Sequence, residues 1–192
     1  MKVDFALSNL AETQMTFDRA SLGVRAALPS DAHALRTAIV ELHEQERRLH
    51  DSRLPGEETA DAYLVWMLAE AARDGAVFVA EASGVFAGFA AGWIVQENVI
   101  EETPDSNRFG YISDVCVLPA FRGRRIAALL LETLEARLSL AGVNRIRLSA
   151  LAANRVARAA YERSGYVAYE IVYEKAVRAP TGSRLRQPNA AG

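Results

Sequence analysis

A basic, glycine-containing turn between two regular elements is the stretch of this chain best suited to chemistry. Three arginines, one glycine and small residues make up the turn and its continuation: Arg122, Gly123, Arg124, Arg125, Ala127 and Ala128. A β-branched strand ending at Pro119 precedes the turn, and an apolar helical pattern begins at Ile126. The first N–H groups of a helix lack partners within it and carry the positive end of its dipole. The turn therefore predicts a phosphate-binding site formed by main-chain donors and arginines.

A second group of polar residues recurs on one face of a later helix. Asn154, Ala157 and Tyr161 stand at positions i, i+3 and i+7, so the tyrosine lies two turns from the asparagine. Gly165 and Tyr166 close this pattern. An amide and a phenol therefore project from the same side of the helix.

The other reactive side chains form weaker patterns. Cys116 is the only cysteine, and the histidines lie far upstream, so we expect a small buried side chain and not a nucleophile. His43, Glu46 and His50 can share a helix face, as a metal site requires, but no further ligand is evident and we expect a polar stripe. Three other aromatic residues are expected to fill the core: Tyr63, Trp66 and Trp93.

Composition and charge limit the classes of protein to which the chain can belong. The chain has 192 residues, of which 51% are hydrophobic and 24% are charged, which favours one globular domain. A net charge of -2 and a pI near 6.0 argue against a nucleic-acid-binding protein. The single cysteine excludes an internal disulfide framework, and we find no signal-peptide pattern and no membrane-span-length apolar run. A cytoplasmic protein that binds neither nucleic acid nor membranes is expected.

The elements that must position these residues alternate between strands and helices. We expect strands over 22–27, 76–82, 85–96, 109–117 and 145–150, helices over 32–50, 58–73, 126–140 and 154–164, and a final strand or bent pair of strands over 166–177. A helix joins strands 109–117 and 145–150, so these should be parallel. We expect an N-terminal extension at 1–20, a domain over 21–177 and a disordered tail at 178–192.

In this order of elements and in two motifs, the chain resembles the GNAT superfamily of N-acyltransferases over residues 22–177. The acyl-CoA signature of that family is Gln/Arg-x-x-Gly-x-Gly/Ala after a Val-x-Pro strand end, which Val117-Leu118-Pro119 and Arg122-Gly123-Arg124-Arg125-Ile126-Ala127 resemble. A second family motif, Asn-x-x-Ala-x-x-x-Tyr-x-x-x-Gly-Tyr/Phe, is matched by Asn154, Ala157, Tyr161, Gly165 and Tyr166. The chain departs from the first motif at Arg125, where a second glycine is usual. The substitution is tolerated if the φ angle there is negative.

The resemblance implies an α/β fold and a place for a cosubstrate. The expected fold has a mixed, mostly antiparallel central sheet flanked by helices, and acetyl-CoA would occupy a V-shaped cleft where strands 109–117 and 145–150 splay apart. The pantetheine arm would pair with the first of these strands, and the diphosphate would lie on the turn before the helix. The implied cofactor-binding residues are Val115, Cys116, Val117, Arg122, Gly123, Arg124, Arg125, Ile126, Ala127, Ala128, Asn154 and Ala157.

The resemblance also implies a reaction, the transfer of an acetyl group to a primary amine by direct attack. Tyr161 would protonate the departing thiolate, and a backbone N–H near Cys116 or Val117 would polarise the carbonyl. Asp114 is the candidate base, although its strand parity is opposite to that of Ser113, where related enzymes often carry a glutamate. Other carboxylates remain open as the base: Glu101, Glu102 and those of the first helix.

Two other functions remain open at this point. A catalytically silent acyl-CoA-binding sensor or regulatory module would keep the cleft and lose the base, which Ser113 suggests. A nucleotide-binding regulator that docks DNA is disfavoured by the acidic pI. In this family the region of residues 43–58 commonly shapes the acceptor pocket, and its acidic residues favour a cationic small-molecule or peptide amine. Homodimers are common in the family, so a homodimer is an expected assembly.

Overall fold

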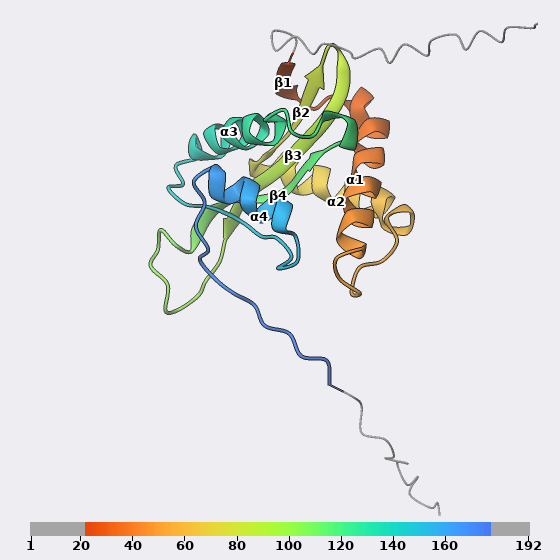
Figure 1. Cartoon of the computed structure of the whole chain (residues 1–192). Coiled ribbons are helices and arrows are strands. Elements are labelled where there is room, and N and C mark those ends of the chain that lie inside the picture. The colour runs from red at the N-terminus through yellow and green to blue at the C-terminus, as the bar shows by residue number, and fades with distance from the viewer. Residues whose placement is uncertain (1–21, 178–192) are drawn as a thin grey trace, which may run out of the picture.

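A five-stranded sheet lies at the centre of the computed structural model, which describes residues 22–177 (Figure 1). Its strands are β1 (Leu22–Ala26), β2 (Ala76–Ala82), β3 (Val85–Gln96), β4 (Arg108–Val117) and β5 (Ile146–Leu148), in spatial order β1-β2-β3-β4-β5. The first four strands pair antiparallel, and β4 pairs with β5 in parallel. The predicted mixed, mostly antiparallel sheet is therefore confirmed, including its parallel pair.

Helices cover both faces of this sheet. They are α1 (Ala32–Arg47), α2 (Gly56–Asp74), α3 (Ile126–Ser139) and α4 (Arg155–Arg163), with short 3-10 turns η2 (Pro29–Asp31) and η3 (Pro119–Phe121). α1 and α2 pack on one face and α3 on the other (Figure 1). Along the chain, α4 follows β5. The predicted helices are all present, although α1 ends at Arg47 and does not continue to His50.

The core consists of two apolar layers, one on each side of the sheet. β3 is buried on both faces, so Phe89 packs toward α1 and α2 while Ala90 packs toward α3. Gly110 lets α3 and β5 approach β4 closely, because a Cβ at this position would lie 2.6 Å from Cδ1 of Ile146 and 3.1 Å from Cβ of Leu138. The parallel pair that borders the expected cleft is thereby held against the α3 layer.

The predicted final strand over residues 166–177 is wrong. Within the described residues, no helix or strand follows α4. Alternating β-branched and aromatic residues indicated a strand, but a strand also needs an edge to pair with, and β5 is only three residues long. Side chains hold the segment instead: the Tyr166 hydroxyl donates to Glu135, and the Tyr169 hydroxyl donates to Glu102.

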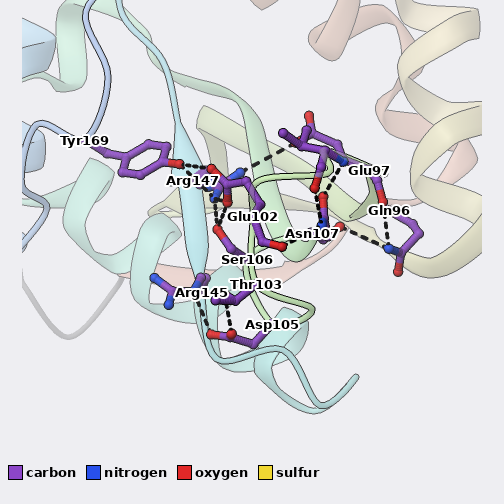
Figure 2. A network of polar contacts seen from close by, with 11 residues as sticks. Gln96, Glu97, Glu102, Thr103, Asp105, Ser106, Asn107, Arg145, Arg147 and Tyr169 are labelled. Carbon is purple, nitrogen blue, oxygen red and sulfur yellow. Dashed lines mark hydrogen bonds and ion pairs between the residues drawn. The ribbon is translucent and has the colours of Figure 1, made fainter.

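A network around Arg147 ties this segment to the sheet (Figure 2). The guanidinium lies 4.1 Å from the ring centroid of Phe109 and 4.6 Å from that of Tyr169. It also pairs with Glu102 at 3.3 Å and Glu97 at 3.7 Å, both from the loop between β3 and β4. β5, this loop and the C-terminal segment are therefore joined through one side chain.

The expected N-terminal extension (1–20) and disordered tail (178–192) lie outside the described residues. Among the helices of residues 22–177, none has the length and apolar character needed to cross a bilayer.

Candidate active site

The pairing of β4 with β5 stops in the middle of β4. The paired residues are Gly110 with Ile146, Tyr111 with Arg147 and Ile112 with Leu148. The next residue, Ser113, is the extra residue of a β-bulge, because Ile112 pairs with Gly92 and Asp114 pairs with Ala91. Beyond Ile112 the backbone of β4 has no strand on this side among the described residues. This open edge is where the splayed cleft was predicted.

The bulge brings two predicted catalytic residues into contact despite their opposite parity. The Ser113 hydroxyl donates to Oδ2 of Asp114 at 2.5 Å. After the bulge, Asp114 and Cys116 face α1 and α2, whereas Val115 and Val117 face α3. A hydroxyl at the end of the β4–β5 pairing is therefore connected to a carboxylate under the α1–α2 layer.

Asp114 is buried and has a raised pKa. Only 4% of the residue is exposed, and burial raises the pKa of its carboxyl to about 6, with the charge of Glu46 acting in the same direction. Hydrogen bonds from Ser113 and Tyr63 oppose this shift. The Tyr63 hydroxyl of α2 lies 2.9 Å from Oδ1 and 3.0 Å from Oδ2 of Asp114. The Asp114 carboxyl therefore changes between its protonated and ionised forms near pH 6.

Tyr161 of α4 lies in the same electrostatic environment. Burial raises the pKa of its phenol to about 12, and the charges of Asp114, Glu46 and Tyr111 add to this effect. Among residues 22–177, its hydroxyl has no hydrogen-bond partner, and its ring packs edge-on to Tyr166 at 6.2 Å. Tyr161 therefore keeps its proton at neutral pH and has it available for another group.

Asn154 begins α4 as its N-cap. Its Oδ1 accepts a hydrogen bond from the backbone N–H of Ala157 at 3.1 Å, which satisfies one of the free donors of the first turn. The Nδ2 group makes no hydrogen bond within the described part of the chain, so the side chain retains donors for a ligand.

The backbone of the basic turn is left-handed at Arg125. Its φ is +63° and its ψ is 14°, so the negative φ under which an arginine would be tolerated there is not present. The turn also contains Gly123 at φ +77°. Arg125 occupies the N-cap position of α3, and the left-handed conformation there is the one that a second glycine adopts without a steric penalty. The turn geometry thus remains that of a glycine although the side chain is an arginine.

The arginines of this turn have different surroundings. Nε of Arg122 donates to the Val117 carbonyl at 3.0 Å, and its Nη2 lies 3.2 Å from a carboxylate oxygen of Glu41 and 2.9 Å from Oε1 of Gln45. The Arg124 guanidinium lies 5.8 Å from the ring centroid of Phe121. Arg124, Arg125 and four other residues line a surface hollow beside α3: Leu22, Ala128, Leu129 and Glu132. Arg122 therefore joins the turn to α1.

A family model described as the acetyltransferase (GNAT) family matches residues 37–166. The chain belongs to this family. It is therefore an N-acetyltransferase, and acetyl-CoA is its cosubstrate. The match includes the bulge at Ser113, the basic turn and Tyr161. No curated protein matches the chain in sequence.

Solved structures share the fold of this acetyltransferase at low sequence identity. The aminoglycoside N-acetyltransferase AAC(6')-Iy in complex with CoA is 21% identical, with a TM-score of 0.61 over 82% of this chain and 95% of that chain. A predicted acetyltransferase with acetyl-CoA from Clostridium acetobutylicum is 19% identical, with a TM-score of 0.64 over 81% and 96%. A GCN5-related N-acetyltransferase from Ralstonia eutropha JMP134 is 18% identical, with a TM-score of 0.65 over 81% and 98%.

Cys116 of the acetyltransferase is buried, as expected. Its Sγ donates to the Ala38 carbonyl at 3.5 Å, and burial raises the pKa of the thiol to about 12. A thiol in this state is a poor nucleophile, because the thiolate is the reactive form. Only the backbone of Cys116 therefore stays a candidate for cosubstrate binding.

His43 and Glu46 of α1 and His50, which follows the end of that helix, do not converge on one point. Nδ1 of His43 lies 2.7 Å from Oγ1 of Thr59, Glu46 pairs with Arg53 at 2.9 Å, and Nε2 of His50 lies 3.3 Å from Glu174. Within the described residues no group of three or more metal-ligating side chains is found.

A row of aromatic rings runs from α1 across α2 to β3, and it corrects one expectation. His43 contacts Tyr63 at 4.7 Å, Tyr63 contacts Trp66 at 5.1 Å, and Trp66 contacts Trp93 at 5.2 Å between ring centroids. Trp93 is buried, as expected, but Trp66 is 44% exposed and is not a core residue. Tyr63 was expected only to fill the core, and its bond to Asp114 was missed. A buried aspartate within an apolar strand requires donors, and that requirement is the sequence signal for such a partner.

Proposed function

We propose that this acetyltransferase moves the acetyl group of acetyl-CoA to a primary amine by direct attack, without a covalent enzyme intermediate. One observation carries the proposal: where the β4–β5 pairing stops, the Ser113 hydroxyl donates to the buried carboxyl of Asp114, whose charge also raises the pKa of Tyr161. Acyl transfer to an amine needs a base on one side of the carbonyl carbon and a proton donor for the leaving group on the other. At neutral pH the Asp114 carboxyl can accept a proton, because its pKa is about 6, and the Tyr161 phenol can donate one, because its pKa is about 12.

The cosubstrate is proposed to lie along the open edge of β4. Main-chain groups of Val115, Cys116 and Val117 that face this edge would pair with the pantetheine arm, as an added strand does, and the Val117 carbonyl would exchange its bond from Arg122 for one to the ligand. The diphosphate would lie on the N–H groups of residues 123–128 at the start of α3, whose dipole favours negative charge. Nδ2 of Asn154 would donate to the pantetheine arm from the side of α4. Arg124 supplies positive charge near the same turn, while Arg122 is held by α1.

Tyr161 is proposed as the donor to the departing sulfur. Its phenol is protonated at neutral pH, since burial raises its pKa to about 12. Burial also raises the pKa of a thiol, so the coenzyme thiolate formed beside Tyr161 is more basic than it is in water. A backbone N–H of β4 near Cys116 or Val117 would stabilise the carbonyl oxygen in the transition state.

The acceptor is proposed to be a cationic small-molecule or peptide amine that binds beside α1 and α2. Glu46 and the exposed ring of Trp66 offer a carboxylate and an aromatic face on these helices. The similar structure of AAC(6')-Iy is that of an aminoglycoside N-acetyltransferase, and aminoglycosides are polycationic amines, which supports the same class of acceptor.

Two further properties are proposed from the sequence. A cytoplasmic location is supported by the single, unpaired Cys116. A homodimer is supported by the exposed apolar side chains at the C-terminal end of the described residues, which are Val167, Tyr169, Ile171, Val172, Tyr173 and Val177. Sedimentation of the purified protein at two concentrations checks the assembly.

The decisive experiment combines binding and turnover. Calorimetry should detect CoA and acetyl-CoA, with ADP as the control that lacks pantetheine and should bind more weakly. Thiol release from acetyl-CoA should then depend on an amine drawn from a panel of monoamines, polyamines, aminoglycosides and peptides. Absence of CoA binding overturns the proposal. Tight CoA binding without turnover on any amine favours the acyl-CoA-binding sensor instead.

A further inference from the structure

Asp114 is too deeply buried to meet an amine directly. It is 4% exposed, and both carboxylate oxygens are occupied by neighbouring hydroxyl groups. Ser113 is less buried, and it lies at the residue where β4 loses its pairing with β5. The Ser113 hydroxyl bonds to Oδ2 of Asp114 and lies 3.4 Å from the Ala91 carbonyl of β3, so it is the half-buried polar group that connects Asp114 with the end of the β4–β5 pairing.

We propose that Ser113 relays a proton from the attacking amine to Asp114, and that Tyr63 is the positioning residue that holds Asp114 ready to accept it. This inference rests on the proposed amine acetylation. It assigns a role to a tyrosine of α2 and makes the hydroxyl at position 113 the group that contacts the substrate.

The geometry around Tyr63 fits a positioning role. Its hydroxyl is nearly equidistant from the two oxygens of Asp114, at 2.9 and 3.0 Å, so it fixes the plane of the carboxylate and leaves Oδ2 in contact with Ser113. The Tyr63 ring is itself held between His43 at 4.7 Å and Trp66 at 5.1 Å. The donor therefore cannot move away from Asp114 without disturbing the α1–α2 layer.

The charges near Asp114 keep it a proton acceptor and not a permanent anion. No lysine, arginine or histidine bonds to it within residues 22–177, and its two donors are neutral hydroxyls. The ionisable groups that interact with it are Glu46 from α1, Tyr63 from α2, Cys116 from β4 and Tyr161 from α4. These groups are acids, so none of them pairs with the carboxylate as a cation would.

The relay balances as one coupled transfer. An N–H bond of the protonated amine breaks and its proton binds to Oγ of Ser113, while the original hydroxyl proton of Ser113 moves to Oδ2 of Asp114. The serine is unchanged, Asp114 becomes a neutral acid, and the amine gains the lone pair that attacks the thioester carbonyl. After product release, Asp114 returns its proton to water by the same path.

The first test needs no substrate. In protein labelled with ¹³C at aspartate carboxyl carbons, the Asp114 resonance is assigned by its loss in Asp114→Asn, and its titration is followed by NMR. Tyr63→Phe removes one hydroxyl and keeps the ring, so the midpoint should rise by about one pH unit as the anion loses a donor. Tyr166→Phe is the matched control, because it removes another partly buried tyrosine-to-carboxylate bond, to Glu135, and should leave the Asp114 midpoint unchanged. An unchanged midpoint in Tyr63→Phe overturns the positioning role.

The second test uses turnover. Ser113→Ala should lower kcat by about 100-fold, within the usual range for proton-transfer groups, while the Kd for CoA stays within about threefold. Ser113→Thr retains a hydroxyl and should recover most of the rate. The acid limb of kcat/KM should move upward in Tyr63→Phe with the NMR midpoint. A kcat for Ser113→Ala equal to that of the parent overturns the relay. A parent protein that acetylates no amine overturns the proposed function, while the NMR titration still decides the coupling of Tyr63 to Asp114.

Discussion

Gly123 and Arg125 both adopt left-handed backbone conformations, two residues apart in the turn that begins α3, with φ angles of +77° and +63°. The left-handed region costs a glycine nothing, whereas it costs an L-residue about 1–2 kcal/mol. The backbone of the turn is therefore strained at Arg125 and not at Gly123. The family motif usually has glycine at the strained position.

Arg125→Gly should stabilise the protein. We expect a rise of roughly 0.5–1 kcal/mol in the free energy of unfolding, because the relieved strain exceeds the entropy that glycine adds to the unfolded chain. Urea unfolding measures the change. The Arg125→Gly variant should also retain its affinity for CoA, since the backbone donors of the turn stay in place.

Arg124→Gly is the matched control for this prediction. Arg124 is the same residue type in the same turn, but its φ is not positive, so glycine relieves no strain there. This variant should lose stability or stay unchanged. A gain in Arg124→Gly equal to that in Arg125→Gly would show that removal of charge, and not relief of the backbone, stabilises the turn.

Asn154 is expected to cap α4 through its Oδ1 and to bind the cosubstrate through its Nδ2, and two substitutions separate these roles. Asn154→Ala removes the N-cap of α4 and should lower the free energy of unfolding by about 1 kcal/mol. Asn154→Asp keeps an oxygen for the Ala157 N–H, so it should preserve stability. It replaces the Nδ2 donor by an oxygen, however, and should weaken CoA binding by about tenfold. Chemical unfolding and calorimetry measure the two effects; equal CoA affinity in Asn154→Asp and the parent would remove the amide from the cosubstrate site.

Local patterns were sufficient to predict most elements of the fold. The β2–β3 hairpin has the predicted bounds, because the Ser83–Gly84 turn lies between two β-rich runs and both residues adopt positive φ. α4 lies within its predicted bounds because residues 154–164 carry a local helical pattern that ends at Gly165. The parallel pairing of β4 and β5 followed from the handedness of a strand–helix–strand connection.

The features that local patterns missed depend on contacts between distant residues. Tyr63 and Asp114 are 51 positions apart, and their bond exists only because α2 packs over β4. The bulge at Ser113 interrupts a strand whose alternating pattern gives no sign of it. The segment after α4 has the composition of a strand, but composition does not reveal whether an edge is available to pair with it. The positive φ of Arg125 is imposed by the turn against the preference of the residue.

Asp114 should make the stability of the protein depend on pH in an unusual direction. Its pKa is raised from 3.8 to about 6 in the folded state. A group with a raised pKa stabilises the fold below pH 3.8, and this contribution is lost as pH rises to 6. Asn at this position does not titrate, so the stability of Asp114→Asn relative to the parent should increase by at most about 3 kcal/mol from pH 4 to pH 7. Urea unfolding at several pH values measures the difference.

Asp31 supplies the control of opposite sign. Its bond to Arg25 lowers the pKa of its carboxyl to about 2, so the ionised form stabilises the fold above pH 3.8 and this contribution is lost as pH falls to 2. Asp31→Asn should therefore become less stable than the parent as pH rises from 2 to 4, whereas Asp114→Asn gains relative stability between pH 4 and 7. A pH-independent difference for Asp114→Asn would contradict its raised pKa.

Tyr161→Phe should reduce turnover and spare the binding of the cosubstrate. We expect kcat to fall by about 100-fold, because the departing thiolate loses its proton donor, while the Kd for acetyl-CoA stays within about twofold. The phenol has a pKa of about 12, so it keeps its proton throughout the assay range and should add no basic limb to the pH–rate profile. The ratio of the kcat of Tyr161→Phe to that of the parent should therefore be the same at every pH between about 6 and 10. Tyr166→Phe, whose ring contacts that of Tyr161 at 6.2 Å, is the control and should retain most of the rate. Steady-state kinetics at saturating acetyl-CoA provides the measurement, and a kcat within twofold of the parent for Tyr161→Phe would exclude the phenol as the proton donor.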